Sequence, residues 1–138
     1  MNENANIDIN SDLFLNSLLK LENDYTDSDT VSLRKREFKV GYCVENFNGQ
    51  KVMILNQKKF IQHKFFGPLY PSHTFEGEVT NAIIIGWKLK CTRLIDDDYG
   101  GNWERINQVL GTNHFKFRIT ASFMRDLNWE INIYYILK

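Results

Sequence analysis

Strict alternation of apolar and polar residues near the C-terminus constrains the fold of this chain more than any other feature. Apolar side chains occupy every second position in residues 115–123 and again in residues 129–137. Successive side chains of a β-strand point to opposite faces, so this period of two predicts two half-buried strands. We expect them to form an antiparallel hairpin closed by the turn at residues 124–128. The expected cross-strand pairs are Ala121 with Ile131, Ile119 with Ile133 and Phe117 with Tyr135.

The same period of two marks residues 38–45 and residues 82–95. The dipeptide Asn48-Gly49 follows the first of these segments and precedes an apolar run at 52–55. Both residues of the dipeptide tolerate the positive φ angles of a type I′ turn, so the pattern predicts a second hairpin. Its expected pairs are Val44 with Met53 and Tyr42 with Leu55. One face of the 82–95 strand would carry Ile83, Ile85, Trp87, Leu89 and Cys91.

Apolar residues recur at helical spacing in residues 12–25, which predicts an amphipathic helix. Ser11 is suited to cap its N-terminus. The apolar stripe must lie on an apolar surface, either the protein's own sheet or a partner. A second, short helix is expected near 103–110, because Asn102 suits an N-cap and Gly111 suits the position after the last turn. The stripe of the first helix consists of Phe14, Leu18, Leu21 and Tyr25.

The length of 138 residues fits one domain, and aromatic residues make up 14% of the chain, which favours strands. We therefore expect an α+β fold in which a twisted, mainly antiparallel sheet of about five or six strands carries both helices. The single domain 1–138 would have a polar lead-in at 1–11, a helix at 12–25 and a sheet-rich body at 31–138. An open curved sheet with a concave pocket and a closed sandwich both fit the pattern.

No phosphate-binding loop, dinucleotide fingerprint, zinc-protease motif or serine-hydrolase motif is present. We therefore predict no cofactor, no metal and no catalytic residue, and we lean towards a protein without enzymatic activity. Cys43 and Cys91 lie within apolar strand patterns and are interpreted as buried, structural thiols. Glu76 and Glu78 would share one side of a strand, so a carboxylate pair keeps the enzyme alternative open.

The chain begins with a polar, acidic segment that does not resemble a secretory signal. No uninterrupted apolar stretch reaches the length that a membrane-spanning helix needs. We expect a soluble protein of the cytoplasm, or of the host-cell interior if the protein is viral.

The first candidate site is a basic sheet face. If the 82–95 strand lay beside the C-terminal hairpin, four cations would project from one surface, where they could bind a phosphate backbone or an acidic protein. The alternative is an ordinary solvated face, and the formal net charge of zero favours that alternative. The four cations are Lys88, Lys90, Lys116 and Arg118.

The second candidate is the segment 58–75, in which basic and aromatic residues interleave. Both prolines of the chain, Pro68 and Pro71, lie here, so we expect residues 58–78 to be mostly irregular, as a long ordered loop with a short strand at most. Exposed rings in such a loop suit a protein hot spot or single-stranded nucleic acid, whereas rings that plug the core would be structural. We favour a protein partner among the functional alternatives. The residues singled out are Lys59, His63, Lys64, Phe65, Phe66 and Tyr70.

The third candidate is the acidic turn Asp96, Asp97 and Asp98. Its start resembles that of a calcium loop, but Asn107 occupies the position where such a loop needs a bidentate glutamate. The turn is interpreted as the end of a strand, or as an acidic knob that docks on a basic partner.

These observations lead to three functional hypotheses. The first is a non-enzymatic protein-binding module, such as an immunity or inhibitor protein or a small viral or phage assembly component. Its partner would be another protein or a second copy of the chain. The second is a nucleic-acid-binding module that uses the basic face and the aromatic-basic loop. The third is a small-ligand binder or enzyme with a pocket inside the curved sheet.

Overall fold

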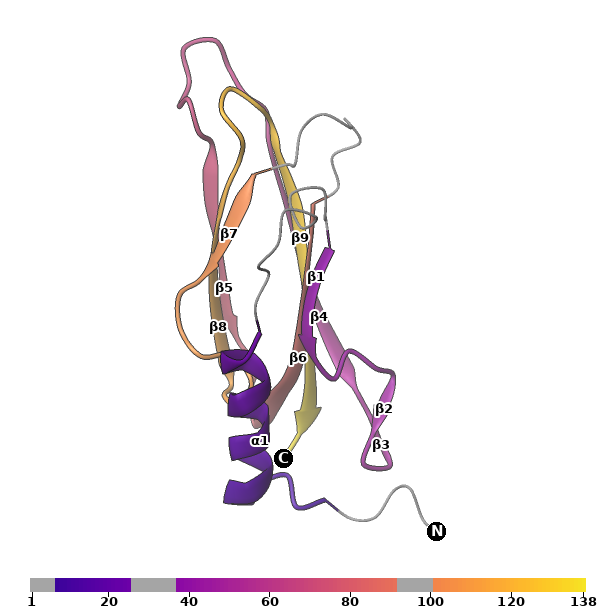
Figure 1. Cartoon of the computed structure of the whole chain (residues 1–138). Coiled ribbons are helices and arrows are strands. Elements are labelled where there is room, and N and C mark those ends of the chain that lie inside the picture. The colour runs from indigo at the N-terminus through magenta and orange to yellow at the C-terminus, as the bar shows by residue number, and fades with distance from the viewer. Residues whose placement is uncertain (1–6, 26–36, 92–100) are drawn as a thin grey trace.

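The fold is a two-layered sandwich of antiparallel sheets with a single helix in the part of the chain that the structure describes (Figure 1). The structure is a computed structural model, and it describes residues 7–25, 37–91 and 101–138. One sheet has the order β1 (Glu37–Gly41), β6 (Ala82–Cys91), β9 (Leu127–Leu137) and β4 (Met53–Ile61). The other has the order β5 (Ser72–Glu78), β8 (His114–Thr120) and β7 (Asn102–Arg105). The α+β class and the antiparallel pairing predicted from the sequence are confirmed.

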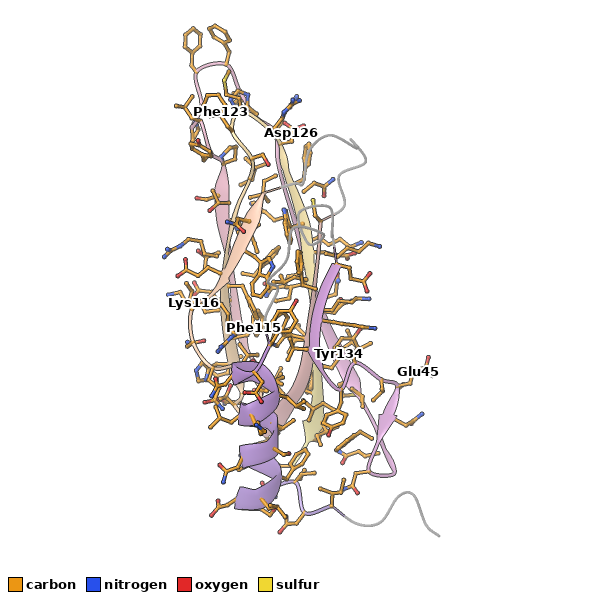
Figure 2. The ribbon with its side chains drawn as sticks, in the orientation of Figure 1. Glu45, Phe115, Lys116, Phe123, Asp126 and Tyr134 are labelled. Carbon is orange, nitrogen blue, oxygen red and sulfur yellow. The ribbon has the colours of Figure 1, made fainter. Side chains whose placement is uncertain are left out.

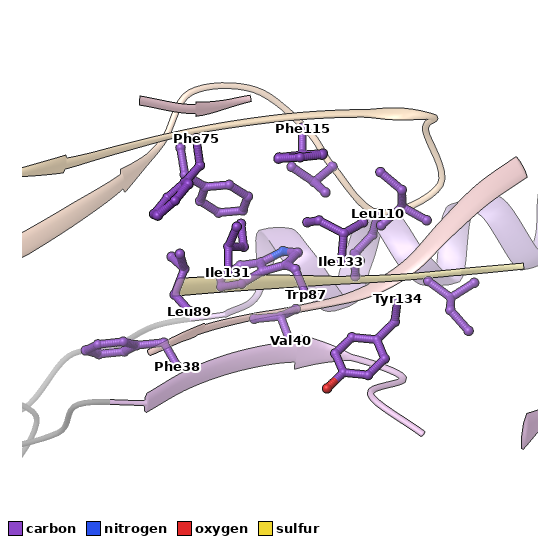
Figure 3. Packing of buried hydrophobic residues seen from close by; sticks show 14 of the residues in the cluster. Phe38, Val40, Phe75, Trp87, Leu89, Leu110, Phe115, Ile131, Ile133 and Tyr134 are labelled. Atoms are coloured by element: carbon purple, nitrogen blue, oxygen red, sulfur yellow. The ribbon is translucent and has the colours of Figure 1, made fainter. Parts of the chain in front are cut away.

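The core fills the space between the two sheets (Figure 3). Trp87 of β6 and Phe117 of β8 meet edge to face, with their ring centroids 4.9 Å apart. Ile131 and Ile133 of β9 are fully buried and lie on the same face of the four-stranded sheet as Trp87. Of the two arrangements that the sequence left open, the closed sandwich is therefore the one observed. The alternating apolar residues form these inner faces because every second side chain of a strand points into the core.

The strands β8 and β9 carry the predicted alternation, but they do not form the predicted hairpin. β8 pairs with β5 and β7, whereas β9 pairs with β6 and β4 in the opposite sheet. The predicted pairs Phe117 with Tyr135, Ile119 with Ile133 and Ala121 with Ile131 are therefore wrong. Phe117 lies opposite Phe75. The connection at residues 121–126 crosses from one layer to the other, so the two apolar faces meet across the core instead of sharing a sheet.

The turn predicted at Asn48-Gly49 is confirmed, because both residues have positive φ angles of 54° and 72°. It closes the short hairpin of β2 (Asn46–Phe47) and β3 (Gln50–Lys51). The longer pairing of Val44 with Met53 and Tyr42 with Leu55 is wrong, since β4 pairs along its whole length with β9. The apolar strand β9 offers β4 a longer ladder than the β1 region does.

The short helix predicted near 103–110 is also wrong. Residues 102–105 form the edge strand β7, in which Trp103 and Arg105 point inward and their neighbours point outward. Val109 and Leu110 follow as two consecutive buried residues of the loop 106–113, in which Gly111 has a φ of 83°. The apolar spacing that resembled a helix therefore arises from a strand followed by a tight loop.

Residues 58–78, predicted as mostly irregular, are largely strand. β4 continues to Ile61 and β5 starts at Ser72, which leaves a loop of residues 62–71 between the two sheets. Proline has no backbone N–H to donate, so it is excluded from the interior of a strand ladder. Both prolines of the chain lie within this loop.

The N-terminal helix α1 (Asp12–Asn23) is confirmed. Ser11 caps it as predicted, because its Oγ accepts a hydrogen bond from the backbone N of Phe14 at 3.2 Å. Phe14 and Leu18 are buried against the sandwich, whereas Leu21 is exposed and Glu22 is buried in its place. The helix lies at the end of the sandwich that also holds the C-terminus (Figure 1). Within the described ranges, no helix is long and apolar enough to cross a membrane.

Candidate functional site

The end of the sandwich opposite the C-terminus is formed by two connections between the sheets (Figure 1). The loop 62–71 joins β4 to β5, and the turn 121–126 joins β8 to β9. Backbone hydrogen bonds tie the two connections together, from Met124 N to Leu69 O at 2.7 Å and from Ala121 N to Pro71 O at 2.8 Å. The backbone N of His63 donates to Asp126 Oδ1 at 2.7 Å. The loop is therefore anchored at both of its ends to a neighbouring turn.

Apolar side chains project from this anchored end into solvent. We call them the aromatic tip, which consists of Phe65, Phe66, Leu69, Tyr70, Phe123 and Met124. Phe65 is 85% exposed and Phe66 is 96% exposed, and their rings meet edge to face at 4.9 Å. The rings of Tyr70 and Phe123 lie 5.5 Å apart, and Figure 2 shows Phe123 at this end of the molecule. The rings do not plug the core, so the structural alternative for this segment does not hold for Phe65 and Phe66.

The tip was predicted only in part. Phe65, Phe66 and Tyr70 were singled out from the loop sequence, whereas Leu69, Phe123 and Met124 were not. The exposure of Phe123 and Met124 could have been inferred from the sequence, because the period of two ends there. Two adjacent apolar residues of a strand cannot both point into the core. Met124 adopts a positive φ of 55°, as a turn residue does.

Of the three polar candidates of the same segment, His63 and Lys64 lie in the loop, whereas Lys59 lies on β4. Lys59 belongs to β4 and is paired in register with Trp129, which places it on the inner side near the sheet edge. Lys64 is exposed within the loop, where its carbonyl accepts from Gly67 N at 2.8 Å. A hollow of about 140 Å³ adjoins His63 and Lys64, and it is smaller than a typical site for a small organic ligand. Its lining residues are Ile61, Gln62, His63, Lys64, Gly67, Pro68 and Pro71.

The structure does not assemble the basic face. Lys88 and Lys90 lie on β6, on the outer face of the four-stranded sheet. Lys116 and Arg118 lie on β8, on the outer face of the other sheet. Their neighbours along the strand, Phe115 and Phe117, point into the core between the two sheets. The four cations therefore occupy opposite sides of the sandwich.

Each half of the predicted face also has acidic neighbours. Lys116 Nζ lies 3.9 Å from Glu76 Oε2, and Arg118 Nη1 lies 3.9 Å from Glu104 Oε2. On the other sheet, the register places Lys90 between Glu37 and Glu130. Alternating charges of this kind cancel at the distances over which a polyanion would be attracted.

The acidic turn Asp96, Asp97 and Asp98 lies outside the described residues. Among the residues that are described, no group of three or more His, Cys, Asp or Glu side chains could hold a metal ion.

The titratable groups near the core do not have the properties of a nucleophile and its base. Burial raises the pKa of the Cys43 thiol to about 11, so the thiol is protonated at neutral pH. Its Sγ lies 3.5 Å from the carbonyl oxygen of Trp87, to which the thiol donates. Burial, assisted by the charge of Lys59, lowers the pKa of His73, whose ring is neutral at pH 7. Glu76 and Glu78 do share the outer side of β5.

The space between the sheets is occupied by core side chains, which excludes the pocket inside a curved sheet from the described part of the chain. A hollow of about 350 Å³ lies beside α1, outside that core. Its lining residues are Ser17, Lys20, Leu21, Asp24, Tyr25 and Tyr42.

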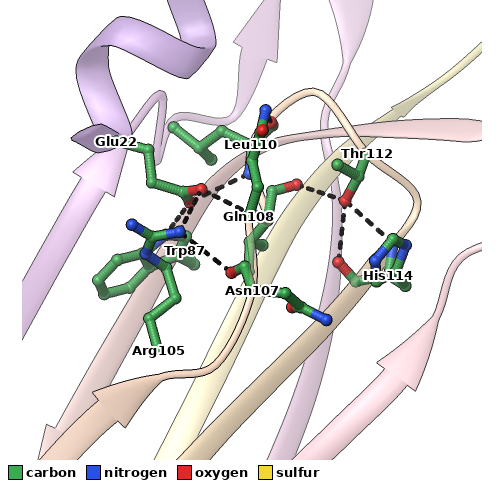
Figure 4. Close-up of polar contacts among 9 residues, drawn as sticks. Glu22, Trp87, Arg105, Asn107, Gln108, Leu110, Thr112 and His114 are labelled. Atoms are coloured by element: carbon green, nitrogen blue, oxygen red, sulfur yellow. Dashed lines mark hydrogen bonds and ion pairs between the residues drawn. The ribbon is translucent and has the colours of Figure 1, made fainter.

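A polar cluster around Glu22 was not predicted (Figure 4). The Glu22 side chain is fully buried and accepts hydrogen bonds from Trp87 Nε1 at 2.9 Å and from Arg105 Nη1 at 3.1 Å. The backbone N of Val109, at 2.7 Å, and that of Leu110, at 3.1 Å, also donate to it. The sequence signal was available, since Phe14, Leu18 and Glu22 follow one another at i+4 spacing on the buried stripe. The cluster fastens α1 to β6 and to the loop after β7.

Comparison of the chain with protein-family models, with the curated proteins and with the solved structures finds no match.

Proposed function

We propose that the chain is a protein-recognition module whose aromatic tip inserts into an apolar pocket of a partner protein. The observation that carries this proposal is the pair of adjacent rings, Phe65 and Phe66, held almost wholly in solvent on an anchored loop. An immunity or inhibitor protein, or a small assembly component of a virus or phage, are the classes of protein that fit such a module.

Energetics favour burial of these rings by a partner. Removing one phenylalanine side chain from water stabilises a complex by about 1.5–3 kcal/mol. Aromatic anchors that fill a pocket dominate the binding energy of many protein interfaces. A chain that keeps two such rings exposed at 85% and 96% retains this free energy for binding.

Preorganisation supports the same proposal. The hydrogen bonds of Leu69 and Pro71 to the neighbouring turn, with that of His63 to Asp126, restrict the loop before any partner arrives. A restricted loop loses less conformational entropy on binding than a free one, so more of the burial energy appears as affinity.

The charge distribution supports a protein partner more than a nucleic acid. Acidic residues neighbour the cations on both sheet faces, and the net charge of the chain is zero. Binding to a phosphate backbone requires several uncompensated cations on one surface.

A photoreactive phenylalanine analogue placed at position 66 tests the proposal in the native cell. We expect irradiation to join the tip to one protein in near-stoichiometric amount. The matched control is the same analogue at position 137, because Leu137 is 48% exposed at the other end of the molecule. Adducts to lipid or nucleic acid at position 66, no adduct, or equal adducts from both positions would refute the proposal.

A further inference from the structure

The strand β4 forms an open edge of the four-stranded sheet. It has nine residues and lies last in the strand order, and its only ladder among the described residues is with β9. Its described contact with β5 is made by a side chain, from Gln57 Nε2 to Glu76 O at 3.3 Å. An open edge of this length presents unpaired backbone donors and acceptors, which are suited to pairing with another strand.

The outer row of β4 also exposes apolar side chains. Lys59 and Ile61 pair with the buried residues Trp129 and Leu127, so the odd-numbered residues point inward and the even-numbered ones outward. In the outer row, Ile54 is 53% exposed and Phe60 is 58% exposed, and Asn56 and Lys58 lie between them.

The sequence of β4 is self-complementary about its midpoint, Gln57. Ile54 and Phe60 lie three residues on either side of Gln57, and Met53 and Ile61 lie four residues on either side. An antiparallel partner of the same sequence, centred on the same residue, would place apolar opposite apolar at both ends. Such reciprocity is the property that a two-fold symmetric interface requires.

We propose that two copies of the chain pair through β4, antiparallel and centred on Gln57, so that one continuous sheet crosses both copies. In this register Ile54 lies opposite Phe60 of the second copy, and the symmetry repeats that pair. Aromatic residues opposite β-branched residues are favourable cross-strand neighbours. This dimer does not depend on the aromatic tip.

The lysines select this register over its neighbours. Centring the pair on Lys58 would place the two copies of Lys58 directly opposite each other, which is unfavourable for like charges. Centring it on Asn56 would place Lys58 opposite Ile54 and leave Phe60 beyond the end of the paired strand. With the centre at Gln57, Lys58 lies opposite Asn56 and keeps Glu130 as its neighbour on β9.

Pairing through β4 stops at two copies, because the free edge of β4 is used on both of them. Since β4 leads towards the aromatic tip and the second β4 runs in the opposite direction, the two tips would point to opposite ends of the dimer. The result would be a bivalent module.

Three variants test the register by measuring the dimer dissociation constant in sedimentation equilibrium. We expect a species of twice 16.3 kDa for the natural chain. Ile54→Lys alone and Phe60→Glu alone should each weaken dimerisation by roughly tenfold or more. The double variant should restore it, because each new cation then lies opposite a new anion of the other copy. Both positions are exposed, so the monomer fold is retained and is verified by circular dichroism.

Leu13→Lys provides the matched control, since Leu13 is 84% exposed on α1, away from β4, and its replacement should leave the dissociation constant unchanged. A chain that stays monomeric up to roughly 1 mM has no affinity of the expected order and overturns the proposal. So does a dimer that the single variants leave intact, or one that the double variant fails to restore.

Discussion

Glu22 joins four parts of the molecule through one carboxylate. It belongs to α1, and its four donors come from β6, β7 and the loop 106–113. A buried carboxylate is tolerated only when its oxygens are fully hydrogen-bonded, and this one has an arginine among its donors. The hydrogen bonds of Glu22 fix the position of the helix on the sandwich.

Replacing Glu22 with alanine should lower the free energy of unfolding by about 3–5 kcal/mol, because it leaves the indole N–H of Trp87 and the backbone N–H groups of Val109 and Leu110 without their acceptor in a buried site. It also removes the carboxylate that pairs with Arg105. Urea unfolding followed by circular dichroism measures the change. Glu104→Ala is the matched control, since its pair with Arg118 is exposed and long, and it should cost at most about 1 kcal/mol. Equal losses in the two variants would contradict the assigned role of Glu22.

Cys43 provides a pH-dependent test at the same scale. Burial raises the pKa of its thiol from 9.0 to about 11, so folding favours the protonated form. This contribution to stability is complete below pH 9, where the unfolded chain keeps its thiol protonated, and it declines as the pH rises towards 11.

We expect the native protein at pH 8 to react with a thiol-specific reagent much more slowly than the protein unfolded in urea does, because the thiolate is the reactive form. Cys43 is partly buried and Cys91 is buried. The rate of alkylation of Cys43, followed by mass spectrometry from pH 7 to pH 11, measures the shift. A native alkylation rate whose midpoint lies near pH 9.0, the ordinary pKa of the thiol, would contradict it.

At the scale of helices and strands, the sequence predicts the conformation of each segment better than it predicts which strands pair with each other. The period of two identifies β8, β9 and the buried side of each, and the helical stripe identifies α1. Alternation does not reveal whether two consecutive strands share a sheet or face each other across a core, because both arrangements bury the same side chains. The predicted hairpin at residues 115–137 failed for this reason. The rings of Phe65, Phe66 and Tyr70 could be proposed from the loop sequence, but their exposure required the positions of both sheets.

Gly41 explains why β1 ends where it does. Its φ is 85°, and a Cβ at this position would collide with the carbonyl oxygen of Ile85 on the paired strand. Only glycine permits both the backbone conformation and the close approach of the two strands.

Gly41→Ala should therefore destabilise the protein by about 2 kcal/mol or more, the sum of backbone strain and overpacking. Gly49→Ala is the matched control, because Gly49 also has a positive φ but no atom within 4 Å of the added Cβ. It should cost about 1 kcal/mol, the backbone contribution alone. Thermal unfolding compares the two variants, and a cost for Gly49→Ala as large as that for Gly41→Ala would contradict the collision.

At the scale of the whole molecule, the helix and its stabilising polar cluster are separate from the proposed recognition site. The helix α1, which carries Glu22, lies towards one end of the sandwich, and the aromatic tip lies at the other (Figures 1 and 2). The rings of Phe65 and Phe66 bury little surface within the chain, so their removal should not affect folding. Loss of partner binding at constant stability is thus the distinguishing property of a recognition site.

The most direct test is the affinity of the crosslinked partner for the double variant Phe65→Ser/Phe66→Ser, measured by isothermal titration calorimetry. The account predicts a loss of at least about 30-fold, corresponding to one hot-spot side chain of about 2 kcal/mol, with an unchanged unfolding temperature. The matched control Leu13→Ser/Leu137→Ser removes two exposed apolar residues away from the tip and should bind like the natural chain. An unchanged affinity of the tip variant would contradict the proposal that the aromatic tip is the recognition site.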